Sequence, residues 1–184
     1  MLGAYEILKQ IKKGNITIEP FNEKQLNPNS YNVRIADKIK VYNSRAVLDS
    51  RSENTAYNEI IIPPEGFILL PNVLYIGSTK EIIGSDKFIS AIDGRSSFGR
   101  LGMQIHLTAG FGDVGFHGTY TLEITVVQPL RIYPDDQIAQ VYFEKVDGKV
   151  DFLYSGRYQN QTGATTSKSN LDDKQIKNYH YKGK

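Results

Sequence analysis

The chain has 184 residues, of which 40% are hydrophobic and 23% charged. This length favours a single domain, and the composition is that of an ordinary globular protein, which excludes a disordered or collagen-like chain. The net charge is +2, and residues 168–184 alone hold five Lys and two Asp. The body is therefore almost neutral and lacks the basic face typical of a duplex-binding protein, so we expect no nucleic-acid partner.

Several sequence features that would place the chain elsewhere in the cell are missing. No apolar run approaches the roughly 18 residues needed to cross a bilayer, so we expect no membrane-spanning helix. No basic stretch followed by an apolar core marks a secretory signal. The chain has no Cys, which excludes disulfides, thiolate catalysis and Cys-rich zinc sites. These absences together predict a cytoplasmic protein without zinc.

The first predicted element is a short helix at the N-terminus. Apolar residues recur there every three positions, and a Gly follows them as a stop signal. These residues are Leu2, Tyr5, Leu8, Ile11 and Gly14.

After this helix the hydrophobic period changes to two, which is typical of strands. The strand-like segments are bounded by Gly, Pro, Asn or Asp, the usual residues of turns. They comprise residues 15–19, 31–36, 38–42, 59–62, 67–70, 74–78, 88–92, 103–108, 119–127, 130–133 and 137–145. So many short strands predict a mainly β fold, a barrel or a sandwich, with one helix added. From Ser155 onward the chain is rich in small polar residues, which predicts a mobile tail that orders, if at all, on binding.

The first candidate site is the segment 93–100, between two predicted strands. Its two Gly, two Ser and two Arg offer backbone N–H groups, hydroxyls and guanidinium groups, all of which bind phosphate oxygens well. Spacing alone leaves two interpretations open. The segment is either a polyphosphate-binding turn or a polar hairpin turn with solvated Arg side chains.

A second candidate is the segment 110–118, in which four Gly surround Asp113. Glycine permits a backbone to crowd a ligand, and a carboxylate held there could bind a sugar hydroxyl or a metal-bound water. The alternative is an Asp that caps a tight turn, and the pattern taken singly favours it.

A third candidate is Glu123, in the middle of the predicted strand 119–127. The apolar residues Leu122, Ile124 and Val126 alternate along this strand, so Glu123 faces the opposite side between two Thr residues. A mid-strand carboxylate lies either on a wet face, the commoner case, or in a pocket. In a pocket it would be a plausible proton shuttle.

Other catalytic patterns are missing. His106, His117 and His180 have no metal-ligand spacing. The zinc-deaminase signature needs Cys and so is not present. Neither a nucleotide-binding P-loop nor the nucleophile elbow of hydrolases occurs.

Taken in order, these segments resemble the dCTP deaminase branch of the trimeric dUTPase-like superfamily. The matching motifs are PNSYNVRI at 28–35, GRSSFGRLG at 94–102, TAGFGDVGF at 108–116, TLE at 121–123, QIAQV at 137–141 and GRYQNQTGAT at 156–165. The resemblance implies a distorted β-barrel or jelly roll, assembled as a homotrimer with its sites at subunit interfaces. It implies one domain at residues 1–170, followed by a polar, Lys-rich tail at 171–184.

The resemblance also implies roles for matching residues. Glu123 is the implied acid–base, Ser96 and Arg100 hold the attacking water and the developing charge, and Asp113 lies under the deoxyribose 3′-hydroxyl. Arg95, Ser96, Ser97 and Arg100 bind the phosphates, with Mg²⁺ bridging the triphosphate. The backbone at Thr121 and Leu122 reads the pyrimidine edge, and four residues close over the nucleotide: Gln140, Tyr154, Arg157 and Gln161. The implied substrate-binding residues are Arg95, Ser97, Phe98, Gly99, Thr121, Leu122, Gln140, Tyr154, Arg157 and Gln161.

The implied activity is hydrolytic deamination of dCTP without zinc. Members of this branch stop at dUTP or continue to dUMP and diphosphate. The small Gly110 resembles the members with both activities, since it leaves room for a second water, and we expect a dUMP-forming enzyme with dTTP as a possible inhibitor. The alternatives are a deaminase that releases dUTP, a dUTPase without deaminase activity, and a non-catalytic nucleotide-binding trimer.

Four positions depart from the family pattern. Asn32 stands for Asp, Arg157 for Lys and Phe98 for Leu, and none of these changes removes a proposed catalytic group. Gly112 replaces a usual Ile before Asp113, which predicts a looser loop.

Overall fold

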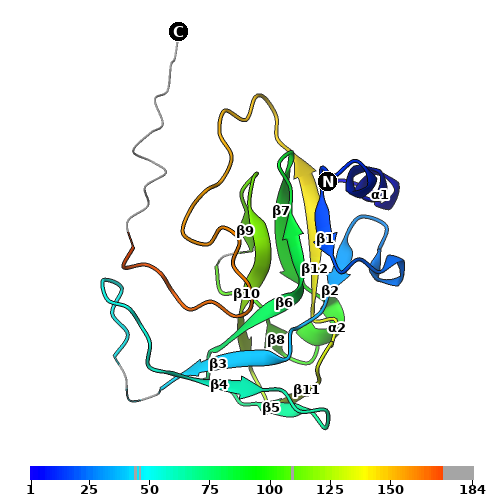
Figure 1. The fold of residues 1–184 in the computed structure, drawn as a ribbon. Coiled ribbons are helices and arrows are strands. Elements are labelled where there is room, and N and C mark those ends of the chain that lie inside the picture. Colours follow the sequence, from blue (N-terminus) through cyan, green and yellow to red (C-terminus); the bar gives the residue numbers. More distant parts are fainter. Residues whose placement is uncertain (44, 46, 109, 172–184) are drawn as a thin grey trace.

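The structure is a computed structural model that describes residues 1–43, 45, 47–108 and 110–171. It is built mainly of strands, with one helix of nine residues at the edge of the body (Figure 1). This confirms the predicted mainly β class, whereas the closed barrel and the homotrimer stay predictions. No helix in the described part of the chain has the length and apolar character that a bilayer crossing requires.

The helical elements are α1 (Ala4–Lys12), the 3₁₀ turn η1 (Glu23–Gln25) and α2 (Ser96–Gly99). The strands are β1 (Thr17–Glu19), β2 (Tyr31–Val33), β3 (Lys38–Tyr42), β4 (Tyr57–Ile61), β5 (Phe67–Leu69), β6 (Tyr75–Gly84), β7 (Phe88–Gly94), β8 (Met103–Gln104), β9 (Phe111–Gly112), β10 (His117–Val126), β11 (Leu130–Ile132) and β12 (Ala139–Lys145).

These strands form three antiparallel sheets. The largest has the order β4-β3-β6-β10-β8, with β1 also paired to β6. A second sheet has the order β2-β12-β7-β9, and β11 pairs with β5 in a third. Strand β10 is central because one edge pairs with β6 and the other with β8.

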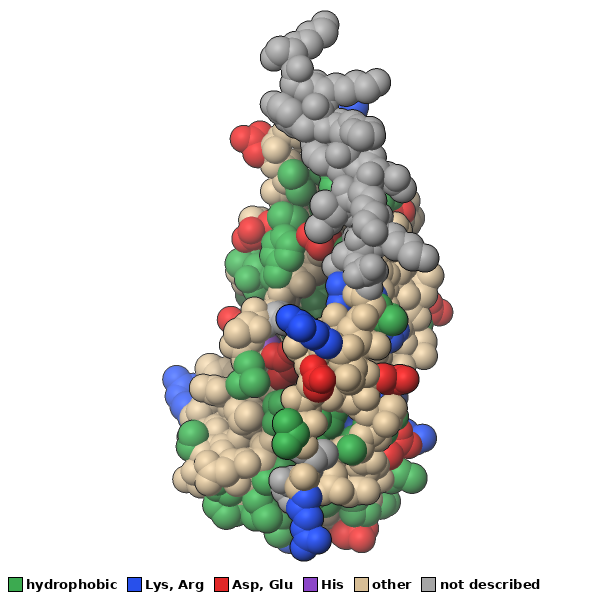
Figure 2. Space-filling view, turned by 90° about the vertical axis from the view of Figure 1, so that its left-hand side faces the viewer, with side chains coloured by type: hydrophobic (Ala, Val, Ile, Leu, Met, Phe, Trp, Pro, Cys, Tyr) green, Lys and Arg blue, Asp and Glu red, His purple; other side chains and the backbone are tan. Residues whose placement is uncertain are grey.

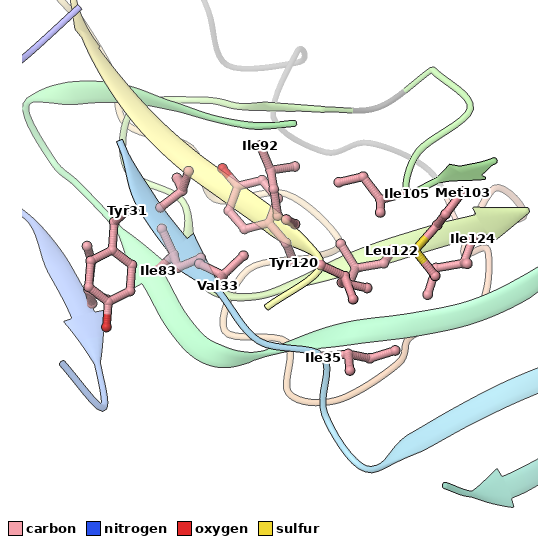
Figure 3. Packing of buried hydrophobic residues seen from close by; sticks show 14 of the residues in the cluster. Tyr31, Val33, Ile35, Ile83, Ile92, Met103, Ile105, Tyr120, Leu122 and Ile124 are labelled. Carbon is pink, nitrogen blue, oxygen red and sulfur yellow. The ribbon is translucent and has the colours of Figure 1, made fainter. Parts of the chain in front are cut away.

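The core is apolar and confirms the predicted alternation along β10. Leu122, Ile124 and Val126 are buried, whereas the residues between them are only partly buried. Figure 3 shows Leu122 and Ile124 in one cluster with Val33 and Ile92 of the other sheet. Each such aliphatic side chain contributes about 1.5–3 kcal/mol on burial, so this packing fixes which face of β10 turns outward.

The helix α1 faces the body differently from the prediction. It buries Ile7 and Gln10, while Tyr5 is 79% exposed. A spacing of three residues drifts around a helix that has 3.6 residues per turn, so Ile7 rather than Tyr5 faces the body. Leu2 lies before α1 and is buried, and Ile11 packs against the core, so the predicted apolar stripe was wrong at Tyr5.

Strand β6 is longer than the predicted segment 74–78, because it continues through the charged residue Glu81. This carboxylate is fully buried, and Oε1 lies 2.7 Å from Nε of Arg34. The backbone N–H of Arg34 and the amide of Gln25 also donate to it. Burial alone would lower the pKa of Arg34. The hydrogen bond to Glu81 and the charge of Glu81 outweigh this effect, so the pKa of Arg34 lies above its usual value.

Replacing Arg34 with Met is expected to cost about 3–5 kcal/mol in the free energy of unfolding, because it leaves the Glu81 carboxylate buried without its charge partner. Urea denaturation measures this loss. The matched control is Lys38→Met, which removes an exposed ion pair with Glu59 and should cost less than about 1 kcal/mol. Equal losses for the two variants would contradict this account of β6.

Two further segments differ from prediction. Only Met103 and Gln104 of the predicted strand 103–108 pair with β10, because the chain turns away from β10 after these residues. The described part of the C-terminal segment is packed along the body, although a mobile tail was predicted from Ser155. Asn160 donates its N–H to the carbonyl of His117, and the carbonyl of Gln161 accepts from Thr119 N. Most of the predicted Lys-rich tail, residues 172–184, lies outside the described residues.

Candidate active site

A cavity of about 520 Å³ opens over the outer face of β10. Its walls come from β10, from the loop before it and from the C-terminal segment. They include the predicted site residues Asp113, Thr121, Glu123, Tyr154 and Gln161. The structure therefore brings together side chains that are up to 48 positions apart in the sequence. We call this space the β10 cavity.

The partly buried carboxylate of Glu123 lines the β10 cavity. Its Oε2 accepts a hydrogen bond of 2.9 Å from the backbone N–H of Leu107, and its own N–H donates to the carbonyl of Ile105. The structure thus decides between the two interpretations of this residue. Glu123 lies in a pocket, held at one oxygen by the segment that follows β8.

The loop that carries Asp113 forms a tight turn, closed by a hydrogen bond from Phe116 N to the carbonyl of Asp113. Gly115 adopts a φ of +96° there, and a Cβ on it would lie 2.6 Å from the backbone N of Tyr154. The turn is closed by backbone groups, and the Asp113 side chain lines the β10 cavity. The backbone of Asp113 and not its carboxylate thus closes the turn, and ligand binding by the carboxylate stays a prediction.

The C-terminal segment contributes the amide of Gln161 to the β10 cavity. Its Nε2 donates to the carbonyl of Thr119 at 2.8 Å and to the hydroxyl of Thr121 at 3.4 Å. Its Oε1 is buried and has no hydrogen-bond partner among the described residues. A buried acceptor without a partner is costly, so this oxygen is a candidate acceptor for a ligand.

The segment 93–100 lines a second cavity, of about 640 Å³. It includes the short helix α2, so the alternative of a hairpin turn is wrong, whereas phosphate binding stays a prediction. Predicted residues on its walls are Arg95, Ser96, Ser97, Gly99 and Gln140. Arg95 donates to the carbonyl of Gln137 at 2.8 Å, and Gln140 accepts from the hydroxyl of Ser30. We call this space the α2 cavity.

Four predicted residues line neither cavity. Arg100 is exposed, Phe98 packs against the core, and the Leu122 side chain is fully buried, which leaves only its backbone for a ligand. The guanidinium of Arg157 donates to the carbonyl of Lys168 at 2.8 Å. The β10 cavity and the α2 cavity share no lining residue, so the two candidate halves of the site are separate within one chain.

The cavity walls also contain residues that sequence reasoning did not predict as part of a site, among them His106 and Tyr120. His106 lines the α2 cavity, with Nε2 3.6 Å from Oδ1 of Asp93, and no spacing signal marks it. Tyr120 lines the β10 cavity and is 5% exposed. Its place beside Thr121 on an alternating strand predicts an inward position, but not its contact with the Asp113 loop. Across the described ranges, no three His, Asp or Glu side chains gather closely enough to hold a metal ion.

Burial raises the pKa of Tyr120 to about 12, against a smaller opposing effect of its hydrogen bond with Ser90. In the unfolded chain the Tyr120 hydroxyl loses its proton near pH 10. The contribution of the neutral, buried Tyr120 to the free energy of unfolding is therefore fully present below pH 10 and falls as the pH rises toward 12. Between pH 8 and pH 11.5 the wild type should lose about 2 kcal/mol of stability relative to Tyr120→Phe. Urea midpoints of both proteins at pH 8 and pH 11.5 measure the difference, and a constant gap would contradict it.

The fold and the cavities define a mainly β protein with two carboxylates, Asp113 and Glu123, on the wall of a cavity. The family model described as dCTP deaminase-like matches residues 1–146. The chain belongs to the dCTP deaminase-like family.

Similar proteins extend this match over most of the chain. A protein from Hathewaya histolytica named "dCTP deaminase, dUMP-forming" is 48% identical over 167 residues, 91% of this chain and 95% of that protein. One of the same name from Clostridium acetobutylicum is 49% identical over 162 residues, 86% of this chain and 92% of the relative.

Among solved structures, a 2′-deoxycytidine 5′-triphosphate deaminase from Agrobacterium tumefaciens superposes with a TM-score of 0.61 at 18% identity. The match covers 79% of this chain and 48% of that one, so this chain spans about half of the longer protein. At this identity the likeness supports the fold alone.

Proposed function

We propose that this protein deaminates dCTP and then hydrolyses the dUTP formed to dUMP and diphosphate at the same site. The observation that carries the proposal is the Glu123 carboxylate in the β10 cavity, next to Thr121 and across from Gln161. The names of the relatives support the same reaction. The active domain comprises residues 1–170 and works in the cytoplasm.

At the base end, water adds to C4 of cytosine and the amino group leaves as ammonia. Glu123 takes the proton of the attacking water and delivers it to N3 or to the leaving amine. The backbone at Thr121 and Leu122 meets the pyrimidine edge. The free Oε1 of Gln161 accepts from the exocyclic amine.

At the sugar end, the Asp113 carboxylate accepts a hydrogen bond from the 3′-hydroxyl. The aromatic ring of Tyr154, also on the cavity wall, closes over the nucleoside. dTTP carries the same sugar and triphosphate, so it competes for this site.

The α2 cavity binds the triphosphate. Arg95, Ser97 and the backbone at Gly99 line it, and guanidinium, hydroxyl and N–H groups all bind phosphate oxygens. Mg²⁺ arrives with the triphosphate as part of the substrate and lowers its charge. The α2 cavity is separate from the β10 cavity within one chain, so the phosphate-binding half comes from a neighbouring copy in a homotrimer. That copy also supplies Ser96 and Arg100, which hold the water and the developing charge.

The second hydrolysis depends on space near Gly110. A Cβ at this residue would lie 2.7 Å from the carbonyl of Ile92 and 3.2 Å from Nε2 of His106. Gly110→Ala is therefore expected to lower the ratio of dUMP to dUTP formed from dCTP severalfold, because the backbone must shift to relieve the contact with Ile92 and the shift disturbs the space needed for the second water. Gly3→Ala is the control, since a Cβ there makes only an ordinary contact at 3.7 Å. An unchanged product ratio would contradict this role.

The release of ammonia tests the deamination. The purified protein should release one ammonia per dCTP consumed, and the zinc chelator 1,10-phenanthroline should leave the rate unchanged in excess Mg²⁺. A protein that binds dCTP but releases no ammonia would overturn the proposal.

A further inference from the structure

Tyr120 lies where three strands meet behind the Asp113 loop. Its hydroxyl is 2.7 Å from Oγ of Ser90 on β7 and 3.1 Å from the Ser90 carbonyl. Its backbone N–H donates to the hydroxyl of Thr79, where the β6–β10 register shifts between Thr119 and Thr121. Tyr120 is therefore held at both its backbone and its phenol group.

The phenol group fills the space beside Gly112. In the register of β7 and β9, Gly112 is opposite Ser90. A Cβ on Gly112 would collide with the Tyr120 hydroxyl and lie 2.9 Å from Oγ of Ser90. The space beside Gly112 is therefore already filled, and the looser loop predicted from this residue is wrong. The hydroxyl of Tyr120 occupies the place that a side chain at 112 would take.

This contact reaches the sugar end of the site through the chain itself. Gly112 directly precedes Asp113, whose charge is close enough to add to the raised pKa of Tyr120. The Tyr120 ring also meets Phe116, at the other end of the Asp113 turn, edge-on with centroids 5.2 Å apart. Tyr120 therefore supports the turn on both sides of the carboxylate.

We propose that Tyr120 is a positioning residue for Asp113. Its hydroxyl, held between Ser90 and Gly112, fixes the Asp113 carboxylate within hydrogen-bonding reach of the substrate's 3′-hydroxyl. It thereby determines how strongly the site selects a sugar that carries this hydroxyl. This inference rests on the proposed sugar-binding role of Asp113.

The test compares Tyr120→Phe with its parent for two ligands, dCTP and 2′,3′-dideoxycytidine triphosphate, which lacks the 3′-hydroxyl. Calorimetric Kd values are measured in a Glu123→Gln background, so that turnover does not interfere. Tyr120→Phe should weaken dCTP binding about tenfold, by analogy with the loss of one buried hydrogen bond. It should leave binding of the dideoxy ligand nearly unchanged.

Two further variants sharpen the comparison. Ser90→Ala removes the other partner of the hydroxyl and should reproduce the ligand-dependent loss, which also covers the case that Tyr120→Phe folds poorly. Tyr31→Phe is the matched control, because Tyr31 is fully buried, its hydroxyl accepts from Asn22 N at 2.9 Å, and it lines neither cavity. Its effect should be the same for both ligands.

The variant Asp113→Asn distinguishes a failure of the positioning role of Tyr120 from a failure of the sugar-binding role of Asp113. If it weakens dCTP binding selectively while Tyr120→Phe and Ser90→Ala weaken both ligands equally, the sugar-binding role stands and the positioning role is overturned. If Asp113→Asn affects both ligands equally, the sugar-binding role itself is wrong and the inference falls with it.

Discussion

Replacing Glu123 with Gln is expected to lower the kcat of dCTP deamination by about 10³-fold, within the range for the loss of a general acid–base. The amide has the same shape and its oxygen can still accept the hydrogen bond from Leu107 N. It cannot take a proton from water. The Kd for dCTP should therefore change only a few fold. Ammonia release measures the first quantity and calorimetry the second.

The matched control for this variant is Glu59→Gln. Glu59 is an exposed strand carboxylate on β4 that pairs with Lys38, away from both cavities. It should keep full activity. If Glu123→Gln retained more than about a tenth of wild-type turnover, another group would have to move the proton and the assignment of Glu123 would be wrong.

Mixing two inactive variants is expected to restore activity. Arg100→Ala removes the guanidinium that we propose one copy supplies to hold the water and the developing charge, and Glu123→Gln removes the acid–base that we propose the neighbouring copy supplies. In trimers refolded from an equal mixture, about a quarter of the sites would combine two intact halves, giving about a quarter of wild-type activity. Each variant alone should be nearly inactive.

The negative control for mixing uses two residues of the same cavity. Asp113 and Glu123 both line the β10 cavity of one chain, so Asp113→Asn mixed with Glu123→Gln forms no site with both residues intact. If neither mixture recovered activity although trimers containing both variants had formed, a site shared between copies would be contradicted.

The face of each strand could be predicted where the alternation is long and one side is buried. The strand 119–127 was placed correctly because Leu122, Ile124 and Val126 must all turn to the same core. This alternation also placed Glu123 on the outer face. The choice between a wet face and a pocket could not be made, since it depends on the segment after β8 and on the C-terminal segment.

Other features depend on contacts that no local pattern contains. The length of β6 was missed because Glu81 interrupts the apolar pattern, and its charge partner Arg34 is 47 positions away. The order of the C-terminal segment depends on backbone groups of β10, such as those of Thr119. The effect of Gly112 was misjudged because the phenol group that replaces a side chain there comes from Tyr120, on another strand.

On the face in Figure 2, acidic and basic side chains of the described residues are interspersed among apolar and neutral atoms. The absence of a nucleic-acid partner stays a prediction.

The central claim is that one site converts dCTP to dUMP. Incubating the purified protein with dCTP and Mg²⁺ and separating the nucleotides by anion-exchange chromatography over time tests it most directly. We expect dUMP to accumulate with little free dUTP. Accumulation of dUTP would contradict the second step, and unchanged dCTP with hydrolysis of added dUTP would contradict deamination itself.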